Sequence, residues 1–266
     1  MFVTNKKSIK MPEYILINNN RVKVVSEFKL LGITIDNKLN FNKNTSMMRK
    51  SINKRLYSIQ KLFQLDLSVK IQFLKTFILP IFDYCSTLVI YFSKHVIQKL
   101  TNSYNNCIFK LINTKKTCTF SVKSSNDFNL WNNHLPFYNL TSFQHRTILR
   151  LQTYIYKLLH FSDSPRNLCN IFIRNSTLNK KYSLRNSNKF FVPSIGYYND
   201  NGSKQFLYFF SKFVNEIMKI EDFDLNFEFF KNRTKNNINL IFIEFVNIFD
   251  NFDLKFKCCY IKPKEN

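Results

Sequence analysis

The carboxylates that could ligate catalytic metal ions are few and scattered over the first 215 residues. Enzymes that act on nucleic acids with two metal ions need several Asp or Glu ligands close together. The carboxylates of this region stand singly, mostly at positions typical of helix caps and turns: Glu13, Glu27, Asp36, Asp66, Asp83, Asp127, Asp163 and Asp200. We therefore expect no catalytic centre and no metal or cofactor site in this chain, and no enzyme activity from it alone.

A denser acidic cluster, Glu221, Asp222 and Asp224, lies near the C-terminus. It stands among phenylalanines at helical spacing, which favours a helix start or a solvated face over a metal site. Sequence motifs of serine, cysteine or zinc-dependent hydrolases do not occur. Nucleophilic catalysis is therefore not indicated either.

The six cysteines are scattered, without a C-x-x-C pair. Adjacent Cys258 and Cys259 could supply half of a zinc site, but no second pair lies nearby and the histidines lack ligand spacing. No secretory leader is evident, so we expect reduced thiols and an intracellular protein, in nucleus or cytoplasm. The most apolar stretch, residues 77–92, contains Pro80 and Asp83 and is shorter than the roughly 20 residues of a span, so it predicts a buried helix and no membrane partner.

The charge of the chain points to a polyanionic partner. It carries 40 Lys and Arg against 17 Asp and Glu, a net charge of +23, together with 30 Phe and 13 Tyr. Such an aromatic chain can bury a core, so it is no disordered basic tail. Its three glycines are too few for Gly-rich phosphate loops. Nucleic acid is the first expectation, and an anionic membrane surface the second.

One predicted helix, beginning near Asn44, separates apolar from basic side chains. Its apolar stripe comprises Met48, Ile52, Leu56, Ile59 and Phe63. With Ile52 at zero, Lys50, Lys54 and Lys61 fall at about 160°, 200° and 180°, while Arg49 and Arg55 flank the stripe. Two interpretations of the basic side are open, an ordinary solvated face and a surface for phosphates.

Around this helix the pattern predicts a mainly α protein with a small N-terminal antiparallel β element, an α+β chain. Predicted strands cover 14–17, 22–25 and 28–35, with a turn at 18–20 and a bulge or a close backbone approach at Gly32. Further helices are predicted at 67–91 (kinked at Pro80), 93–113, 136–161, 204–220 and 238–250. The helix at 136–161 should pack Leu149, Thr153, Tyr156 and either Leu159 or His160 on one side.

The segment Lys29–Phe41, KLLGITIDNKLNF, resembles the primer-grip signature at the end of the palm in reverse transcriptases of non-LTR (LINE-type, jockey-like) retrotransposons. Further likenesses follow in the family's order over Lys75–Phe92, Leu100–Ile112, Leu135–His160 and Tyr182–Asn215. Asn5–Ser8 resembles the preceding family motif, one residue short, with Lys7 as its lysine. The family's F/Y-x-D-D box and its earlier palm aspartate are absent, and Phe41 stands where a tryptophan is usual.

The resemblance implies a palm remnant with a primer-grip-like hairpin over 1–42 and a thumb-like helical bundle over 43–115. A linker and post-thumb region over 116–203 and a helical tail over 204–266 would follow. It implies contacts to an RNA or RNA–DNA duplex without base specificity, while magnesium would belong to the missing palm. The expected nucleic-acid-binding residues are Lys7, Lys29, Gly32, Arg49, Lys50, Lys54, Arg55 and Lys61.

The remaining polymerase is an expected protein partner under this resemblance. Two alternatives remain open at this point. The chain could be a helical protein-interaction or structural module without a nucleic-acid role. It could also be the thumb half of an active polymerase whose palm is missing from the gene model.

Overall fold

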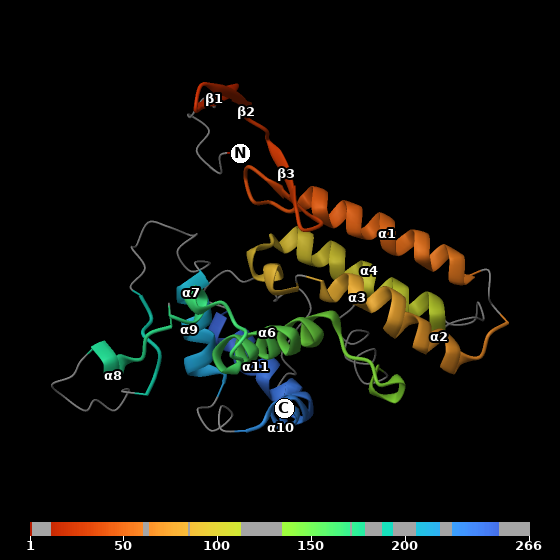
Figure 1. The fold of residues 1–266 in the computed structure, drawn as a ribbon. Coiled ribbons are helices and arrows are strands. Elements are labelled where there is room, and N and C mark those ends of the chain that lie inside the picture. The colour runs from red at the N-terminus through yellow and green to blue at the C-terminus, as the bar shows by residue number, and fades with distance from the viewer. Residues whose placement is uncertain are drawn as a thin grey trace. The chain divides into compact units, whose positions relative to one another are not determined.

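Two short β-hairpins precede a set of helices (Figure 1). The structure is a computed structural model, and it describes residues 1, 12–60, 64–84, 86–112, 135–170, 172–178, 188–193, 206–218 and 225–249. The two sheets are both two-stranded and antiparallel, and nearly all other regular elements are helical. This confirms a mainly α chain with a small N-terminal β element.

The first hairpin pairs β1 (Tyr14–Ile17) with β2 (Asn20–Lys23). Its loop residues Asn18 and Asn19 have φ of 48° and 63°. A two-residue turn with positive φ at both positions suits the twist of the strands, and asparagine tolerates that conformation well. The predicted turn is confirmed, although β2 begins two residues earlier than expected.

The second hairpin pairs β3 (Glu27–Leu30) with β4 (Ile33–Asp36). Leu30 pairs with Ile33, so Leu31 and Gly32 form the loop, with φ of 46° and 85°. The prediction of one strand over 28–35 with a bulge at Gly32 is therefore wrong. Apolar residues continue through the turn, and a leucine in the left-handed region gives no turn signal.

The chain divides into two compact units. Unit 1 comprises Met1–Tyr84 and Tyr91–Thr119, and unit 2 comprises Cys85–Ile90 and Phe120–Asn266. Unit 1 holds both hairpins and the helices α1 (Asn42–Gln60), α2 (Leu67–Phe73), α3 (Leu79–Asp83) and α4 (Lys94–Ile112). A π-helical turn, η1 (Leu74–Ile78), joins α2 to α3, and the 3₁₀ segment η2 (Ser86–Tyr91) follows α3.

The predicted helix over 67–91 is wrong in its second half. Proline has no N–H, and its ring crowds the carbonyl four residues earlier. Ahead of Pro80 the helix widens into η1, where the N–H of Leu79 donates to the carbonyl of Leu74. The α-helical segment then ends at Tyr84, whose backbone is extended.

The core of unit 1 lies between α1 and its helical neighbours. α1 packs against α4, α3, η1 and β4. Ile52 and Leu56 are fully buried and Met48 is half-buried, which confirms that part of the apolar stripe. The side chain of Ile59, and Phe63, lie outside the described residues. Tyr104 of α4 is fully buried and meets Phe82 edge-to-face at 5.2 Å.

Unit 2 is built on α6 (Phe143–His160), with α7 (Arg166–Cys169), α10 (Phe227–Asn236) and α11 (Ile238–Phe249) against it. A 3₁₀ turn, η3 (Leu135–Tyr138), precedes α6, and α8 (Asn175–Leu178) and α9 (Phe206–Glu216) complete the described helices. The hydroxyl of Ser142 accepts a hydrogen bond from the His145 amide. This N-cap starts α6 at Phe143, not at residue 136 as predicted.

The buried side of α6 differs from the predicted one. Ile148, Leu151, Ile155 and Leu158 are buried, whereas Leu149 and Thr153 are only half-buried. Tyr156 is buried as expected and stacks on Phe230 at 4.4 Å. An aromatic cluster of Phe209, Phe213 and Phe245 joins α9 to α11. Neighbouring aromatic side chains thus fill much of this core.

The part of the chain that the structure describes contains no helix long and apolar enough to cross a membrane. The predicted connector 114–134, with Trp131, and the acidic cluster at 221–224 lie outside that part.

Candidate nucleic-acid interface

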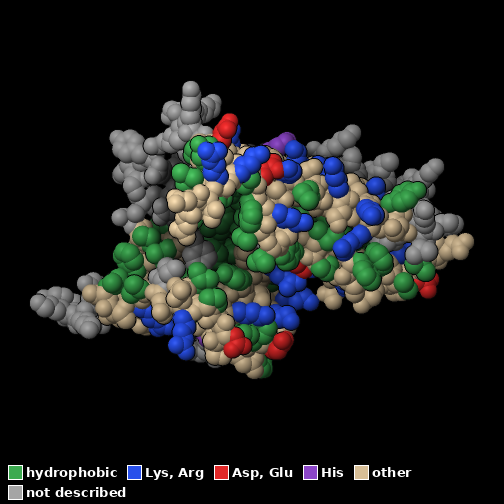
Figure 2. Space-filling model, turned by 45° about the horizontal axis from the view of Figure 1, so that its top comes forward, with side chains coloured by type: hydrophobic (Ala, Val, Ile, Leu, Met, Phe, Trp, Pro, Cys, Tyr) green, Lys and Arg blue, Asp and Glu red, His purple; other side chains and the backbone are tan. Residues whose placement is uncertain are grey.

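The solvent-facing side of α1 carries basic side chains without acidic neighbours on the same helix. α1 contains five Lys or Arg residues and no Asp or Glu. Figure 2 shows Lys and Arg side chains spread over the face that α1 forms in unit 1. Lys50 and Lys54 are both exposed, on the side opposite Ile52. Within the described residues, neither ammonium group has an ion-pair partner.

Two further exposed residues share this side of the helix. By the 100° step per residue, Lys43 falls at about 180° and Tyr57 at about 140° from Ile52. We call Lys43, Lys50, Lys54 and Tyr57 the outward face of α1. Lys43 forms an ion pair with Glu27 of β3, so its charge is partly neutralised. Tyr57 is 64% exposed and places an aromatic ring beside the two lysines.

The two flanking arginines make contacts inside unit 1. The Nε of Arg49 donates to the hydroxyl of Ser103 on α4 at 3.0 Å. Arg55 donates through a terminal nitrogen to the carbonyl of Phe77 in η1. Both arginines are exposed, but these contacts tie α1 to its neighbours. They therefore position the outward face and remain available to a ligand only in part.

The second hairpin presents backbone and one lysine beside this helix. Lys29 is exposed on β3, opposite Thr34 of β4. At Gly32 a Cβ atom would meet only the Tyr84 ring at 3.8 Å, so the positive φ is what favours glycine there. The Tyr84 hydroxyl donates to the carbonyl of Leu31 and anchors the turn. Leu31 itself is 81% exposed.

A short loop fixes the start of α1 relative to this hairpin. The carboxylate of Asp36 accepts hydrogen bonds from the amides of Lys38, Asn40 and Phe41, at 2.9 to 3.0 Å. Phe41 is buried and its ring lies 5.0 Å from that of Phe92. The amide oxygen of Asn44, in the first turn of α1, accepts from the backbone of Thr34. Hairpin and helix therefore form one connected element.

The structure places six of the eight expected binding residues in unit 1. Lys29, Gly32, Arg49, Lys50, Lys54 and Arg55 lie on the second hairpin and α1, whereas Lys7 and Lys61 are outside the described residues. Lys43 and Tyr57 were missed as members of the same face. Lys43 lies seven residues before Lys50, and Tyr57 lies three residues after Lys54, and this spacing was a signal that could have found them.

Two ionisable side chains are held neutral by burial. Desolvation lowers the pKa of His145 in α6 to about 4, and the ring meets Phe242 edge-on at 4.7 Å. Burial raises the pKa of the Cys107 thiol in α4 to about 12. Both groups are uncharged at neutral pH. Among the described residues, no three His, Cys, Asp or Glu side chains are grouped to hold a metal ion.

Comparison with known proteins gives no relative. No family model, no curated protein and no solved structure matches this chain.

Proposed function

We propose that the chain binds RNA or an RNA–DNA duplex, without base specificity, through the outward face of α1. The observation that carries this proposal is the pair Lys50 and Lys54, exposed on a helix without a single carboxylate. The two residues are four positions apart, so their stems start about 6 Å apart along the helix axis. Exposed ammonium groups on a rigid element can replace the counterions of a phosphate backbone.

We further propose that the chain is the catalytically incomplete C-terminal part of a non-LTR retrotransposon reverse transcriptase. The geometry of Lys29–Phe41 supports this reading. The segment forms a tight hairpin, its aspartate holds the loop, and its Phe41 is buried where α1 begins. In this reading the hairpin is the primer grip and α1 is the thumb helix beside the duplex. Magnesium and polymerisation belong to a palm that this chain does not supply, and the protein is intracellular.

A second candidate function has an observation of its own. Phe28, Leu30 and Leu31 of the second hairpin are each at least half exposed. A two-stranded sheet with exposed apolar side chains is marginal alone. This favours a protein contact at the hairpin, either with the remaining polymerase or in a module without a nucleic-acid role. The two functions differ in their dependence on the charge of α1: nucleic-acid binding requires it, and a protein contact at the hairpin does not.

The experiment compares two charge-reversal variants of the full chain in filter binding to a labelled RNA–DNA hybrid. Lys50→Glu/Lys54→Glu should weaken binding about tenfold or more, because it removes two phosphate contacts and adds repulsion. Lys231→Glu/Lys235→Glu in α10 makes the same change in net charge and should have a much smaller effect. Circular dichroism checks that both variants keep their helices. Equal losses, or no loss in the α1 variant, would contradict the proposal.

A further inference from the structure

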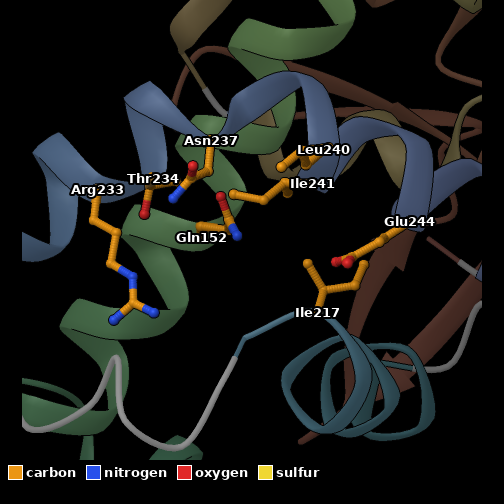
Figure 3. Close-up of a pocket in the computed structure, with 8 residues that line it drawn as sticks. All are labelled: Gln152, Ile217, Arg233, Thr234, Asn237, Leu240, Ile241 and Glu244. Carbon is orange, nitrogen blue, oxygen red and sulfur yellow. The ribbon is translucent and has the colours of Figure 1, made fainter.

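A cavity of about 180 Å³ lies in unit 2, between α6, the end of α9 and the α10–α11 pair (Figure 3). Its floor is formed by Gln152 and Thr234, which are almost fully buried. Its mouth is lined by Arg233, Asn237 and Glu244. A cavity of about 150 Å³ is enough to hold a benzene molecule. The space therefore suits one ring system with small substituents.

The floor of this cavity contains an orphaned acceptor. Gln152 is only 2% exposed, and its Oε1 has no hydrogen-bond partner among the described residues. A buried carbonyl without a donor is unfavourable, because it has lost its hydrogen bonds to water without a replacement. In Figure 3 the Gln152 side chain points toward Asn237 and Ile241, into the cavity. A ligand that brings an N–H group would therefore be favoured.

Two other polar side chains around the cavity, those of Thr234 and Glu244, can also accept hydrogen bonds. The Thr234 hydroxyl donates to the carbonyl of Phe230 at 2.8 Å, which leaves its lone pairs for a further donor. The Glu244 carboxylate and the Arg233 side chain lie at opposite ends of the set of lining residues (Figure 3). Aliphatic side chains of Ile217, Leu240 and Ile241 line the space between the polar groups. This combination suits a flat ring with a donor-rich edge.

We propose that this cavity binds one nucleobase that carries an exocyclic amino group, as part of a nucleotide whose phosphate contacts Arg233. Carboxamide and carboxylate side chains are the usual partners of base amino groups. The planar guanidinium of Arg233, at the mouth, matches the geometry of a phosphate. Cytosine is the smallest such base and adenine the next. The nucleotide class follows from the proposed nucleic-acid function, on which this inference rests.

The ligand has two possible sources with the same chemistry, and calorimetry on the full chain separates them. In the first arm, cytidine and adenosine 5′-monophosphates should bind more tightly than uridine 5′-monophosphate, which lacks the amino group. Ribose 5-phosphate should bind at least tenfold more weakly than either. In the second arm, a hybrid with an unpaired cytidine overhang should bind more tightly than a blunt hybrid if the source is a nucleic-acid strand. Absence of an overhang effect assigns the cavity to the free nucleotide.

The variant that tests the cavity is Gln152→Leu, which removes the orphaned amide and keeps the side-chain volume. It should weaken nucleotide binding about tenfold or more. Gln144→Leu is the matched control, because Gln144 is an equally buried amide about two turns earlier on α6 and does not line the cavity. Should Gln152→Leu not fold, Ile241→Trp is the alternative. Ile241 is half-buried and lines the cavity, so the larger tryptophan side chain should fill the space and abolish nucleotide binding.

The outcomes separate this inference from the proposed function. Nucleotide binding that is lost in Gln152→Leu and retained in Lys50→Glu/Lys54→Glu supports the cavity independently of α1. If no nucleotide binds, or if ribose 5-phosphate binds as tightly as the nucleotides, the cavity is not a base site. Hybrid binding by α1 would be unaffected by that result.

Discussion

The helices α1 and α10 both expose basic side chains but use them differently. On α10, Lys231 lies 3.9 Å from the carboxylate of Glu228, and Lys235 donates to the side chain of Asn139 at 3.1 Å. On α1, Lys50 and Lys54 have no ion-pair partner among the described residues. The net charge of +23 therefore does not locate a binding surface. What locates it is the exposed pair Lys50 and Lys54, to which the described part of the chain offers no ion-pair partner.

The interiors of the two units differ as well. Unit 2 holds a half-buried ionisable ring, His145, together with the buried amides of Gln144 and Gln152. In unit 1 the carboxylate of Asp36, just before α1, accepts hydrogen bonds from backbone amides, and the carboxylate of Glu27 pairs with Lys43. Four predictions use these contrasts.

Acid should act most strongly on unit 2. His145 has a folded-state pKa of about 4 against an unfolded value near 6.5, so the unfolded chain binds the extra proton first. Its contribution to stability is complete above about pH 6.5 and is lost as the pH falls toward 4, a loss of up to about 3 kcal/mol. Urea unfolding followed by circular dichroism should show that His145→Gln loses less stability than the wild type over this window. Equal pH dependence would contradict the burial of a neutral ring.

Removing Asp36 should cost stability. Asp36→Ala leaves the amides of Lys38, Asn40 and Phe41 without their acceptor, so the free energy of unfolding should fall by about 2 kcal/mol. Glu228→Ala is the control, because its exposed ion pair is worth less than about 1 kcal/mol. Urea titration measures both. Similar losses in the two variants would remove this contrast between the carboxylates.

Adding carboxylates to α1 should make it resemble α10. Ser46→Glu/Ser58→Glu places one acid four residues from each of Lys50 and Lys54, on exposed positions. Hybrid affinity should fall about tenfold, although both lysines remain and the new pairs stabilise the helix by about 0.3 to 0.5 kcal/mol each. Ser46→Gln/Ser58→Gln is the neutral control in the same filter-binding assay. Unchanged affinity in the acidic variant would break the comparison between the two helices.

The smallest effect concerns the two hairpin turns. Leu31 and Asn18 occupy the same left-handed position in their turns, with φ of 46° and 48°. Leu31→Asn should therefore raise the local stability of the second hairpin by about 0.5 to 1 kcal/mol and slow its amide exchange. Asn18→Leu should lower the stability of the first hairpin by a similar amount and speed its amide exchange. Hydrogen exchange measured by mass spectrometry reports on the two hairpins separately. Faster exchange in Leu31→Asn would show that Leu31 contributes contacts that outweigh its backbone strain.

The strongly periodic parts of the fold could be predicted from the sequence. The stripe with Ile52 and Leu56, and the helix that became α4, follow from apolar spacing alone. The turn at Asn18 and Asn19 follows from residues that tolerate positive φ. The local pattern could not predict the hairpin at Leu31, because a β-sheet pattern runs through it and only Gly32 marks it; only the resemblance at Lys29–Phe41 implied a hairpin. The break after Tyr84 was hidden in one continuous apolar run.

The candidate site was predictable in its local part only. Lys50 and Lys54 share a helix side by spacing, whereas the pairing of Lys43 with Glu27 joins residues from a helix and a strand. The contacts of Arg49 with Ser103 and of Arg55 with Phe77 also depend on tertiary packing. The cavity at Gln152 forms only because α6 packs against α10 and α11, and the residues around Gln152 in the sequence do not indicate this packing.

The most direct measurement of the central claim is the salt dependence of hybrid affinity. For the wild type, the logarithm of the association constant should fall linearly with the logarithm of salt concentration between about 50 and 200 mM. For Lys50→Gln/Lys54→Gln the slope should be smaller by about two, one for each lost phosphate contact. An affinity that does not change with salt, or the same slope in both proteins, would contradict binding through the outward face of α1.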